Sequence, residues 1–489
     1  MNEPLFELTP RDPFAPSIPL DTPGPMQEQP NEGLAAFDPQ TALDIFHGYI
    51  GVLVIAFLVT LLATPLMRKI AISQGVIDRP NDPRKIHKRP VAYLGGVAVF
   101  LGLMAGILFS YLAPEIGIFG GGLIDHHETQ YPNRATGLPQ VVPYSVLLGM
   151  TIIMLLGLID DVVGVIPRLK IAGMLVAAAA LALDDVGVQV ARGLLAPTLG
   201  RLIGNEQLTF EIMLPLLNQA VTFDLIYWTG TAVIAVFVLG ACNASNLIDG
   251  LDGLLTGVTG VAAFGLLIVA LSLAVLDDGP RDAQRIVLCM ALLGACLGFL
   301  PHNFNPATIF LGDCGSLLMG FVTITIILSL GDTGKTQLVV AGLVIYSIPI
   351  IDTVLAIVRR KLARKSISEA DDQHLHHMLK RSLGVKGAAL SLYGIGALFA
   401  IVGVAMTISR ARITYFLAIV FVSYIIVVAI KIARRQQWEE QASRVKAGAP
   451  NGLTGRMRPE PRAAKPLSRR PAPATEAARP PSSPPPASG

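Results

Sequence analysis

The sequence predicts an all-α polytopic membrane protein with about eleven transmembrane helices, on three observations. Hydrophobic residues make up 52% of the 489 residues and charged residues only 15%, whereas a soluble domain carries about 25% charged residues. The mean hydropathy is +0.58. The apolar residues come in long blocks, and a bilayer core takes about 20 apolar residues per spanning helix.

The apolar windows divide the chain into three parts. Residues 1–45 are rich in Pro, Asp and Glu, so we expect a disordered segment with no cleavable signal peptide. Residues 46–433 form the predicted transmembrane domain, and the Pro/Ala/Arg-rich residues 434–489 form a predicted disordered tail. The windows lie at roughly 46–67, 92–113, 143–159, 169–187, 222–242, 253–276, 286–301, 314–330, 337–358, 388–408 and 412–433.

The distribution of Lys and Arg between the loops predicts the orientation in the membrane. Leaving out the two long termini, the loops on one side carry 17 Lys and Arg and the loops on the other carry 8. Because basic loops stay in the cytoplasm, we expect the N-terminus outside and the C-terminus inside. The expected location is the plasma (inner) membrane.

Composition and cysteine spacing exclude other classes of protein. The formal net charge is +3 and no basic domain is present, so nucleic-acid binding has little electrostatic support. None of the four cysteines forms a Cys-x-x-Cys pair, so neither a disulfide framework nor a zinc ribbon is indicated.

The unusual polar residues all map to the side predicted to be cytoplasmic, which suggests one shared site. Acids near the lipid boundary are costly and usually functional. Four groups stand out: Asp160 and Asp161 at the end of the third window, Asn243, Asn246, Asp249 and Asp252 after the fifth, His302, Asn303 and Asp313 after the seventh, and His374, His376 and His377 after the ninth.

Each of the first two groups has a plainer reading. Asp160 and Asp161 can simply end a helix at the water. On a helix they diverge by about 100°, so we expect one to face the site and the other to orient it. The second group steps by three residues, which spreads it over half a turn, and Gly250 and Gly253 can gather it. A capping turn alone would need one such residue rather than four.

The other two groups suit phosphate chemistry. Asp313 can cap the eighth helix, yet a buried carboxylate near Asn and other Asp side chains also suits Mg²⁺, which prefers oxygen ligands. The three histidines lie among many Lys and Arg residues, which favours an anion site over a zinc site. A solvated basic loop explains the Lys and Arg but not the histidines. Together these residues indicate phosphoryl transfer.

Five motifs, spread over residues 46–433, resemble one enzyme family. They are DRPNDPRKIHKRPVAYLGG (78–96), GLIDD (157–161), NASNLIDGLDGL (243–254), FLPHNFNPATIFLGDCGS (299–316) and PIIDTVLAIVRRK…DDQHLHHML (349–379). In this order they resemble the polyprenyl-phosphate N-acetylhexosamine-1-phosphate transferases, a family that includes the phospho-N-acetylmuramoyl-pentapeptide transferase.

The resemblance implies a reaction, a cofactor and a set of site residues. Such enzymes transfer a sugar 1-phosphate from a UDP-sugar to a polyprenyl phosphate in the membrane and release UMP, with Mg²⁺ or Mn²⁺ required. By motif, Asn246 and Asp313 would bind the metal, and Asp160 or Asp161 would contact the lipid phosphate. The remaining implied site residues are Lys88, Asn243 and Asn303 with Asp252 near the nucleotide, Asp249 beside the metal, and His374, His376 and His377 at the diphosphate or sugar.

The spacing of the last motif points to the donor. The HLHH order and the RKIH…GG loop resemble initiators that use N-acetylglucosamine more than the muramoyl-pentapeptide enzyme, with the C4 epimer of N-acetylglucosamine left open. The expected partners are therefore a UDP-sugar, polyprenyl phosphate, membrane lipids and, in a homodimer, a second copy of the chain. A secondary transporter is the rival of another class, but its acids would lie near the bilayer midplane, often in repeated halves.

Overall fold

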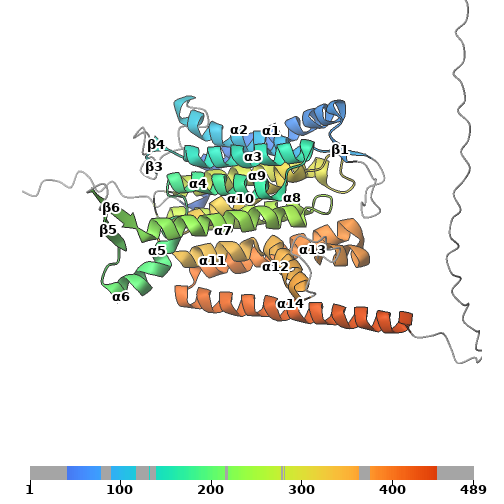
Figure 1. Cartoon of the computed structure of the whole chain (residues 1–489). Helices are drawn as coiled ribbons and strands as arrows, with labels where there is room; N and C mark the ends of the chain where they lie inside the picture. The colour runs from blue at the N-terminus through green and yellow to red at the C-terminus, as the bar shows by residue number, and fades with distance from the viewer. Residues whose placement is uncertain are drawn as a thin grey trace, which may run out of the picture. The chain divides into compact units, whose positions relative to one another are not determined.

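The computed structural model describes residues 41–78, 90–116, 131–132, 139–214, 219–276, 279, 281–362 and 375–448. Its long helices run side by side through one bundle (Figure 1). The helices are α1 (Ala42–Gln74), α2 (Gly95–Ile116), α3 (Tyr144–Val163), α4 (Pro167–Leu183), α5 (Gln189–Leu195), the π-helical turn η2 (Ala196–Gly200), α6 (Arg201–Ile203), α7 (Leu225–Ile248), α8 (Leu254–Val275), α9 (Asp282–Asn303), α10 (Gly312–Ser329), α11 (Thr336–Ile345), α12 (Ser347–Leu362), α13 (Leu375–Ile408) and α14 (Ala411–Gly448). The strands are β1 (Ile77–Asp78), β2 (Val91–Ala92), β3 (Tyr131–Pro132), β4 (Pro139–Gln140), β5 (Thr209–Leu214) and β6 (Gln219–Asp224).

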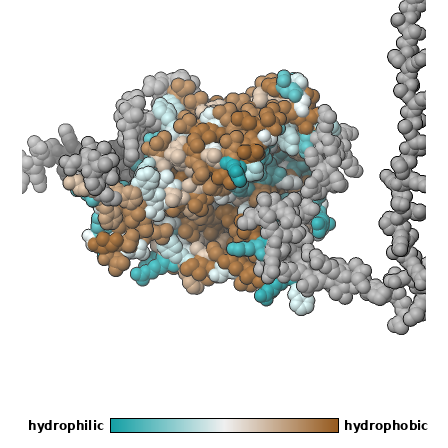
Figure 2. All heavy atoms as spheres, viewed as in Figure 1, coloured by the Kyte–Doolittle hydropathy of each residue, from teal (hydrophilic) through white to brown (hydrophobic). Residues whose placement is uncertain are grey.

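The helices confirm the predicted fold class. In the described part of the chain, nine helices are long and apolar enough to cross a membrane, or ten if the bent pair α11–α12 counts as one span. Ten of the eleven predicted windows each fall on one helix, and the ninth falls on the pair α11 and α12. Helix α4, with 17 residues, is shorter than the nine helices counted here. Much of the visible surface of the bundle is apolar, as expected for a protein surrounded by lipid (Figure 2).

The ninth window, predicted as one straight span, is broken. Helices α11 and α12 meet at Tyr346 with a bend of 80°. Pro349 lies in the first turn of α12. Its ring clashes with the carbonyl four residues earlier, on Ile345, which is the last residue of α11. The sequence therefore places the break where the structure has it.

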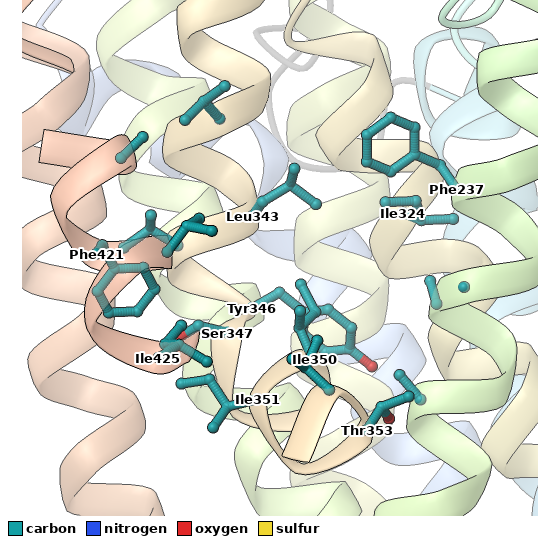
Figure 3. A pocket seen from close by; sticks show the side chains of 18 of the residues that line it. Phe237, Ile324, Leu343, Tyr346, Ser347, Ile350, Ile351, Thr353, Phe421 and Ile425 are labelled. Carbon is teal, nitrogen blue, oxygen red and sulfur yellow. The ribbon is translucent and has the colours of Figure 1, made fainter. Parts of the chain in front are cut away.

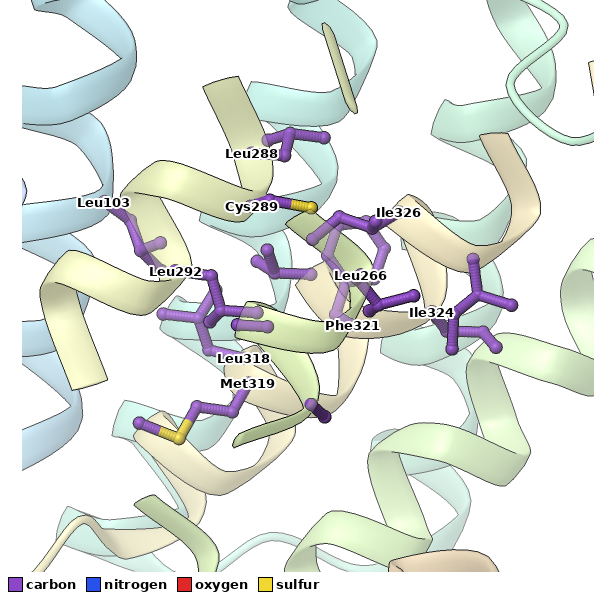
Figure 4. Close-up of a cluster of buried hydrophobic side chains, with 14 of the residues drawn as sticks. Leu103, Leu266, Leu288, Cys289, Leu292, Leu318, Met319, Phe321, Ile324 and Ile326 are labelled. Carbon is purple, nitrogen blue, oxygen red and sulfur yellow. The ribbon is translucent and has the colours of Figure 1, made fainter. Parts of the chain in front are cut away.

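The centre of the bundle is formed by α9 and α10, of which 89% of each membrane window is buried. Figure 4 shows Leu292 of α9 with Leu318 and Phe321 of α10 among the side chains of the apolar core. The start of α9 is also buried although it carries charge. Arg281 donates to the carbonyl oxygen of Asp184 at the end of α4, and Arg285 to that of Ser329 at the end of α10. These arginines join three helix ends.

Two predicted boundaries differ from the structure. Helix α1 begins at Ala42, where the Thr41 side chain accepts a hydrogen bond from the backbone N–H of Asp44. At the other end, α14 continues to Gly448. Residues 434–448, where we expected the disordered tail to begin, are helical. Residues 1–40 and 449–489 lie outside the described residues.

The small β-structures lie at the two ends of the bundle (Figure 1). The antiparallel pair β1–β2 lies at one end, and the pairs β3–β4 and β5–β6 at the other. Ala92 of β2 also pairs with Ile309 through an isolated parallel β-bridge. Gly95 and Gly96 then donate backbone hydrogen bonds to the carbonyl oxygens of Phe310 and Leu311. The start of α2 is thus fixed to the segment that leads into α10.

Candidate active site

The entrance of α10 is held by the end of α3. The two carboxylate oxygens of Asp161 accept hydrogen bonds from the backbone N–H groups of Asp313 (2.8 Å) and Cys314 (3.0 Å). A carboxylate at a helix N-terminus satisfies free N–H groups and interacts favourably with the helix dipole. Gly312 has a φ of 73°, and a side chain there would meet the Asp161 carboxylate. Glycine is therefore required at position 312 for this close approach.

Asp160 points to a different partner from Asp161, as expected for neighbours on a helix. Its Oδ2 lies 2.6 Å from Nζ of Lys170 in the first turn of α4, and its Oδ1 accepts from the backbone N–H of Val165. The same Lys170 nitrogen lies 2.6 Å from Oδ2 of Asp313. Asp160, Lys170 and Asp313 thus form a bridge between α3, α4 and α10. The sequence analysis counted Lys170 only as a loop charge.

Helix α7 adds a carboxamide to this bridge. Nδ2 of Asn246 donates to Oδ1 of Asp313 (2.8 Å) and to the Ser316 hydroxyl (3.0 Å). Asn243, one turn earlier, is exposed and donates to the carbonyl oxygen of Leu239 on its own helix. Asn246 thus joins Asp160, Lys170 and Asp313 in one group of contacting side chains, called the acidic cluster below. Asn243 bonds instead to its own helix.

Asp249 lies just after α7, in the link to α8. Burial raises the pKa of Asp249 to about 8. The negative charges of Asp313, Asp161 and Asp252 add to this rise. A carboxyl group whose pKa is raised by burial and by the charges of three acids marks a site of concentrated negative charge, as functional sites commonly are.

The remaining polar residues of the third and fourth motifs hold the loop between α9 and α10. Oδ2 of Asp252 accepts from Nδ2 of Asn305 and from the backbone N–H of Ala307. Asn303 is only 3% exposed, and its amide is engaged with Thr256 and the carbonyl oxygen of Ile309. In this structure Asn303 is a buried support, so a nucleotide-binding role for its side chain would require these bonds to break.

His376 connects the last motif to the same loop region. Its Nδ1 lies 3.3 Å from a carboxylate oxygen of Asp352 on α12, and both side chains are 1% exposed. A side chain on Gly250 would come within 2.7 Å of the other ring nitrogen, Nε2. His376 is therefore held between α12 and the link that carries Asp249 and Asp252. The sequence analysis did not select Asp352.

Other residues selected from sequence are not placed by the structure. Lys88 and His374 lie outside the described residues. His377 belongs to the first turn of α13, and only its backbone is described.

The assembled cluster offers oxygen atoms and one ammonium group from four helices. Within the described residues, no three His, Cys, Asp or Glu side chains converge as a metal site on their own. Mg²⁺, however, is commonly held by one or two carboxylates together with water and substrate phosphates. The carboxylate of Asp313 and the carboxamide of Asn246 fit that need. An acidic cluster at one end of an apolar helical bundle agrees with the membrane-embedded site for phosphate chemistry that the sequence predicts.

Comparisons with known proteins lead to the family. Residues 143–331 match the model of glycosyl transferase family 4. The chain is 33% identical over 349 residues to the decaprenyl-phosphate N-acetylglucosaminephosphotransferase of Mycolicibacterium smegmatis, covering 66% of this chain and 73% of that relative. It is 29% identical over 384 residues to the probable undecaprenyl-phosphate N-acetylglucosaminyl 1-phosphate transferase of Bacillus subtilis, covering 77% and 91%.

A relative named for another donor is also similar. The phospho-N-acetylmuramoyl-pentapeptide-transferase of Caldicellulosiruptor bescii is 28% identical over 330 residues, covering 67% of this chain and 88% of that relative. The chain belongs to glycosyl transferase family 4. It is a phosphotransferase, which confirms the class of enzyme expected from the five motifs.

Proposed function

We propose that this protein transfers N-acetylglucosamine 1-phosphate from UDP-N-acetylglucosamine to a polyprenyl phosphate, releasing UMP. In the net reaction, an oxygen of the lipid phosphate forms a bond to the phosphorus that carries the sugar. The bond from that phosphorus to UMP breaks, and UMP leaves with the electron pair. The observation that carries the proposal is the contact of Asp160, Lys170, Asn246 and Asp313 at one end of the bundle.

The cluster is the proposed site of Mg²⁺, for which Mn²⁺ can substitute. Asp313 and Asn246 would hold the ion, with Asp249 beside them. The Asn246 amide hydrogens point to Asp313 and Ser316, so its carbonyl oxygen is the atom it offers to a cation. The bound ion would neutralise charge on the diphosphate. The donor set fits because it consists of oxygen atoms, which Mg²⁺ prefers.

The two neighbouring aspartates receive different roles in this proposal. Asp161 uses both oxygens on the backbone of α10, so it positions Asp313. Asp160 faces the cluster and is the candidate that contacts the lipid phosphate. His376, together with Lys88, His374 and His377, would hold the diphosphate or the sugar through charge-assisted hydrogen bonds.

An apolar cavity next to the cluster suits the hydrocarbon chain of the acceptor. Its volume is about 680 Å³, within the range of ligand cavities. Figure 3 shows its lining side chains, which include Phe237 of α7, Ile324 of α10, Leu343 of α11, Ile350 of α12 and Phe421 of α14. An isoprenoid chain gains free energy by burying its apolar surface here.

The cavity and the cluster share helices. Ala244 lines the cavity and Asn246 belongs to the cluster; they lie two positions apart on α7, a rise of about 3 Å and a rotation of about 200°, so the cavity and the cluster lie on opposite faces of this helix. Ile351 lines the cavity, and Asp352 beside it in the chain contacts His376. For an acceptor with its chain in the cavity, the phosphate would have to pass around α7 to reach the acidic cluster.

The charge asymmetry of the loops supports a cytoplasmic site. With 17 Lys and Arg against 8, the end of the bundle that carries the cluster would face the cytoplasm of a cell with this protein in its plasma membrane. UDP-sugars are made in the cytoplasm, so this orientation places the donor and the acidic cluster on the same side.

A comparison of donors tests the proposal. Purified protein is given polyprenyl phosphate, Mg²⁺ and one of three radiolabelled donors: UDP-N-acetylglucosamine, UDP-N-acetylgalactosamine or UDP-N-acetylmuramoyl-pentapeptide. We expect the highest kcat/KM with UDP-N-acetylglucosamine and little transfer of the pentapeptide. The C4 epimer is the nearest competitor, because one inverted hydroxyl is rejected strongly only if the site hydrogen-bonds it. A clear preference for the pentapeptide donor would contradict the proposed substrate.

A further inference from the structure

Lys170 occupies the point where two carboxylates of the cluster converge. Its Nζ lies 2.6 Å from Oδ2 of Asp160 on α3 and 2.6 Å from Oδ2 of Asp313 on α10. The side chains are partly buried, with exposed fractions of 27% for Lys170, 14% for Asp160 and 26% for Asp313. With no cation bound, the ammonium group of Lys170 therefore offsets the negative charge of these two acids.

A divalent cation bound by Asp313, as proposed above, would compete with this ammonium group for the Asp313 carboxylate. Magnesium binds oxygen at about 2.0–2.1 Å, and an ammonium group already within 2.6 Å of both oxygens takes up that space. The two positive charges would also repel each other strongly at such a separation. The cation and the ammonium group cannot share Oδ2 of Asp313.

We propose that Lys170 is an internal counterion, which holds Asp160 and Asp313 together in the cation-free protein and withdraws when a divalent cation binds. The inference rests on the proposed cation site. Three features make the movement easy. The lysine stem has four flexible carbons, its side chain is 27% exposed, and it lies in the first turn of α4. Its side chain can move toward solvent while the helix stays in place.

This role differs from that of a permanent structural bridge. A structural bridge would help to preorganise the acids, so its removal would weaken cation binding. A counterion that must leave opposes cation binding, so its removal would strengthen it. The sign of the change separates the two roles.

The test is Mn²⁺ binding to the full-length protein, measured by electron paramagnetic resonance without either substrate. We compare the wild type with Lys170→Met and with Arg168→Met, a control that removes a nearby exposed charge two residues earlier in α4. We expect Lys170→Met to lower the Kd for Mn²⁺ by about tenfold or more, the size expected for one like charge a few ångströms away at a partly exposed site. Arg168→Met should change it by less than about twofold, because an exposed charge is screened by solvent and salt.

A second variant and a second measurement keep the test decisive. Lys170→Arg retains the charge and makes a more rigid, two-pronged contact with carboxylates, so it should raise the Kd for Mn²⁺. In thermal unfolding with EDTA, Lys170→Met should have a lower Tm than the wild type, and Mg²⁺ should raise its Tm by more than it raises that of the wild type.

The outcomes distinguish this inference from the proposed function. Unchanged or weaker Mn²⁺ binding by Lys170→Met, or tighter binding by Lys170→Arg, would overturn the counterion role while leaving the cation site in place. If neither the wild type nor any variant binds Mn²⁺, and Asp313→Asn behaves like the wild type, the cation site itself is contradicted, and the counterion role falls with it. The identity of the sugar does not affect either result.

Discussion

At the scale of single residues, Asp160 and Asp161 show how one peptide bond separates two tasks. Asp161 accepts hydrogen bonds from two backbone N–H groups at the start of α10, whereas Asp160 faces Lys170 and Asp313. The rotation of about 100° between neighbours on a helix lets one side chain orient the helix that carries Asp313 while the other stays in the cluster.

This division predicts opposite phenotypes for two amide substitutions. Asp161→Asn should lower the Tm, because it removes a negative charge from a helix N-terminus, worth about 0.3–1 kcal/mol, and replaces one of the two accepting oxygens by a donor. Asp160→Asn should leave the Tm nearly unchanged but lower kcat strongly. Thermal unfolding and transfer assays on the same preparations measure both effects. Equal losses of stability in the two variants would show that the roles are not divided.

The raised pKa of Asp249 predicts that the stability of the folded protein depends on pH. Its pKa is about 8 in the folded protein, against an ordinary value of 3.8. Between these values the folded state holds a proton that the unfolded state does not, so stability falls as pH rises through this window and levels off above pH 8. In EDTA, the Tm of the wild type should fall between pH 6 and pH 8. Asp249→Asn should reduce that fall, and identical slopes for the two proteins would rule out this origin.

The site residues predicted from sequence share one pattern, which is an acid or an amide at the end of an apolar window. The site residues that were not predicted lack this pattern. Asp160, Asn246 and Asp313 stand at window ends on one side of the membrane, where apolar helices had no reason to place acids and amides. Lys170 looks like an ordinary basic residue near a loop, and only the fold brings it to Asp160 and Asp313. Asp352 lies inside a predicted span, where an ionisable residue is itself a functional signal. The sequence was therefore sufficient to propose it as a site residue.

At the scale of elements, the link between α7 and α8 is close to the start of α13. A side chain on Gly250 would approach Nε2 of His376 within 2.7 Å. Gly250→Ala should therefore displace His376 and lower kcat/KM by about tenfold or more, since site geometry must hold within about 0.5 Å. Gly394→Ala on α13, which meets nothing within 4 Å, is the matched control and should remain active. Normal activity of Gly250→Ala would argue against a role for this contact.

Helix α14 yields another prediction at this scale, because it extends to Gly448 and lines the apolar cavity through Phe421. Deletion of residues 449–489 should leave transfer intact, since the cluster and the cavity lie earlier in the chain. The measurement is kcat/KM of the truncated protein at matched expression. Complete loss of transfer in a well-expressed truncation would show that the tail takes part in the reaction.

Sequence reasoning located the helices better than it described their interruptions. The predicted window 286–301 begins later than α9 because Arg281, Asp282 and Arg285 are charged and lower the local hydropathy. All three are nevertheless buried in the structure. The break at Tyr346 was missed because hydropathy is continuous through residues 337–358. Pro349 was the available signal, since a helix rarely continues through the residues before a proline.

At the scale of the whole molecule, the account requires that the cluster end of the bundle faces the cytoplasm. Ser382→Cys places a thiol near the cluster end, and Glu206→Cys places one on the segment between α4 and α7 at the opposite end; both positions are exposed. The four natural cysteines are buried, so they should contribute little background. In intact cells, an impermeant thiol reagent should label Glu206→Cys and spare Ser382→Cys. The reverse pattern would overturn the orientation.

The central claim is that segments far apart in the sequence form one catalytic cation site around Asp313. Its most direct test is the rate of transfer of radiolabelled N-acetylglucosamine 1-phosphate to polyprenyl phosphate, measured against Mg²⁺ concentration for the wild type and Asp313→Asn. We predict that EDTA abolishes wild-type transfer. We also predict that Asp313→Asn lowers kcat by about 100-fold or more at saturating Mg²⁺, because a bound metal supplies several kcal/mol of transition-state stabilisation. Near-normal turnover of correctly inserted Asp313→Asn at saturating Mg²⁺ would contradict the account.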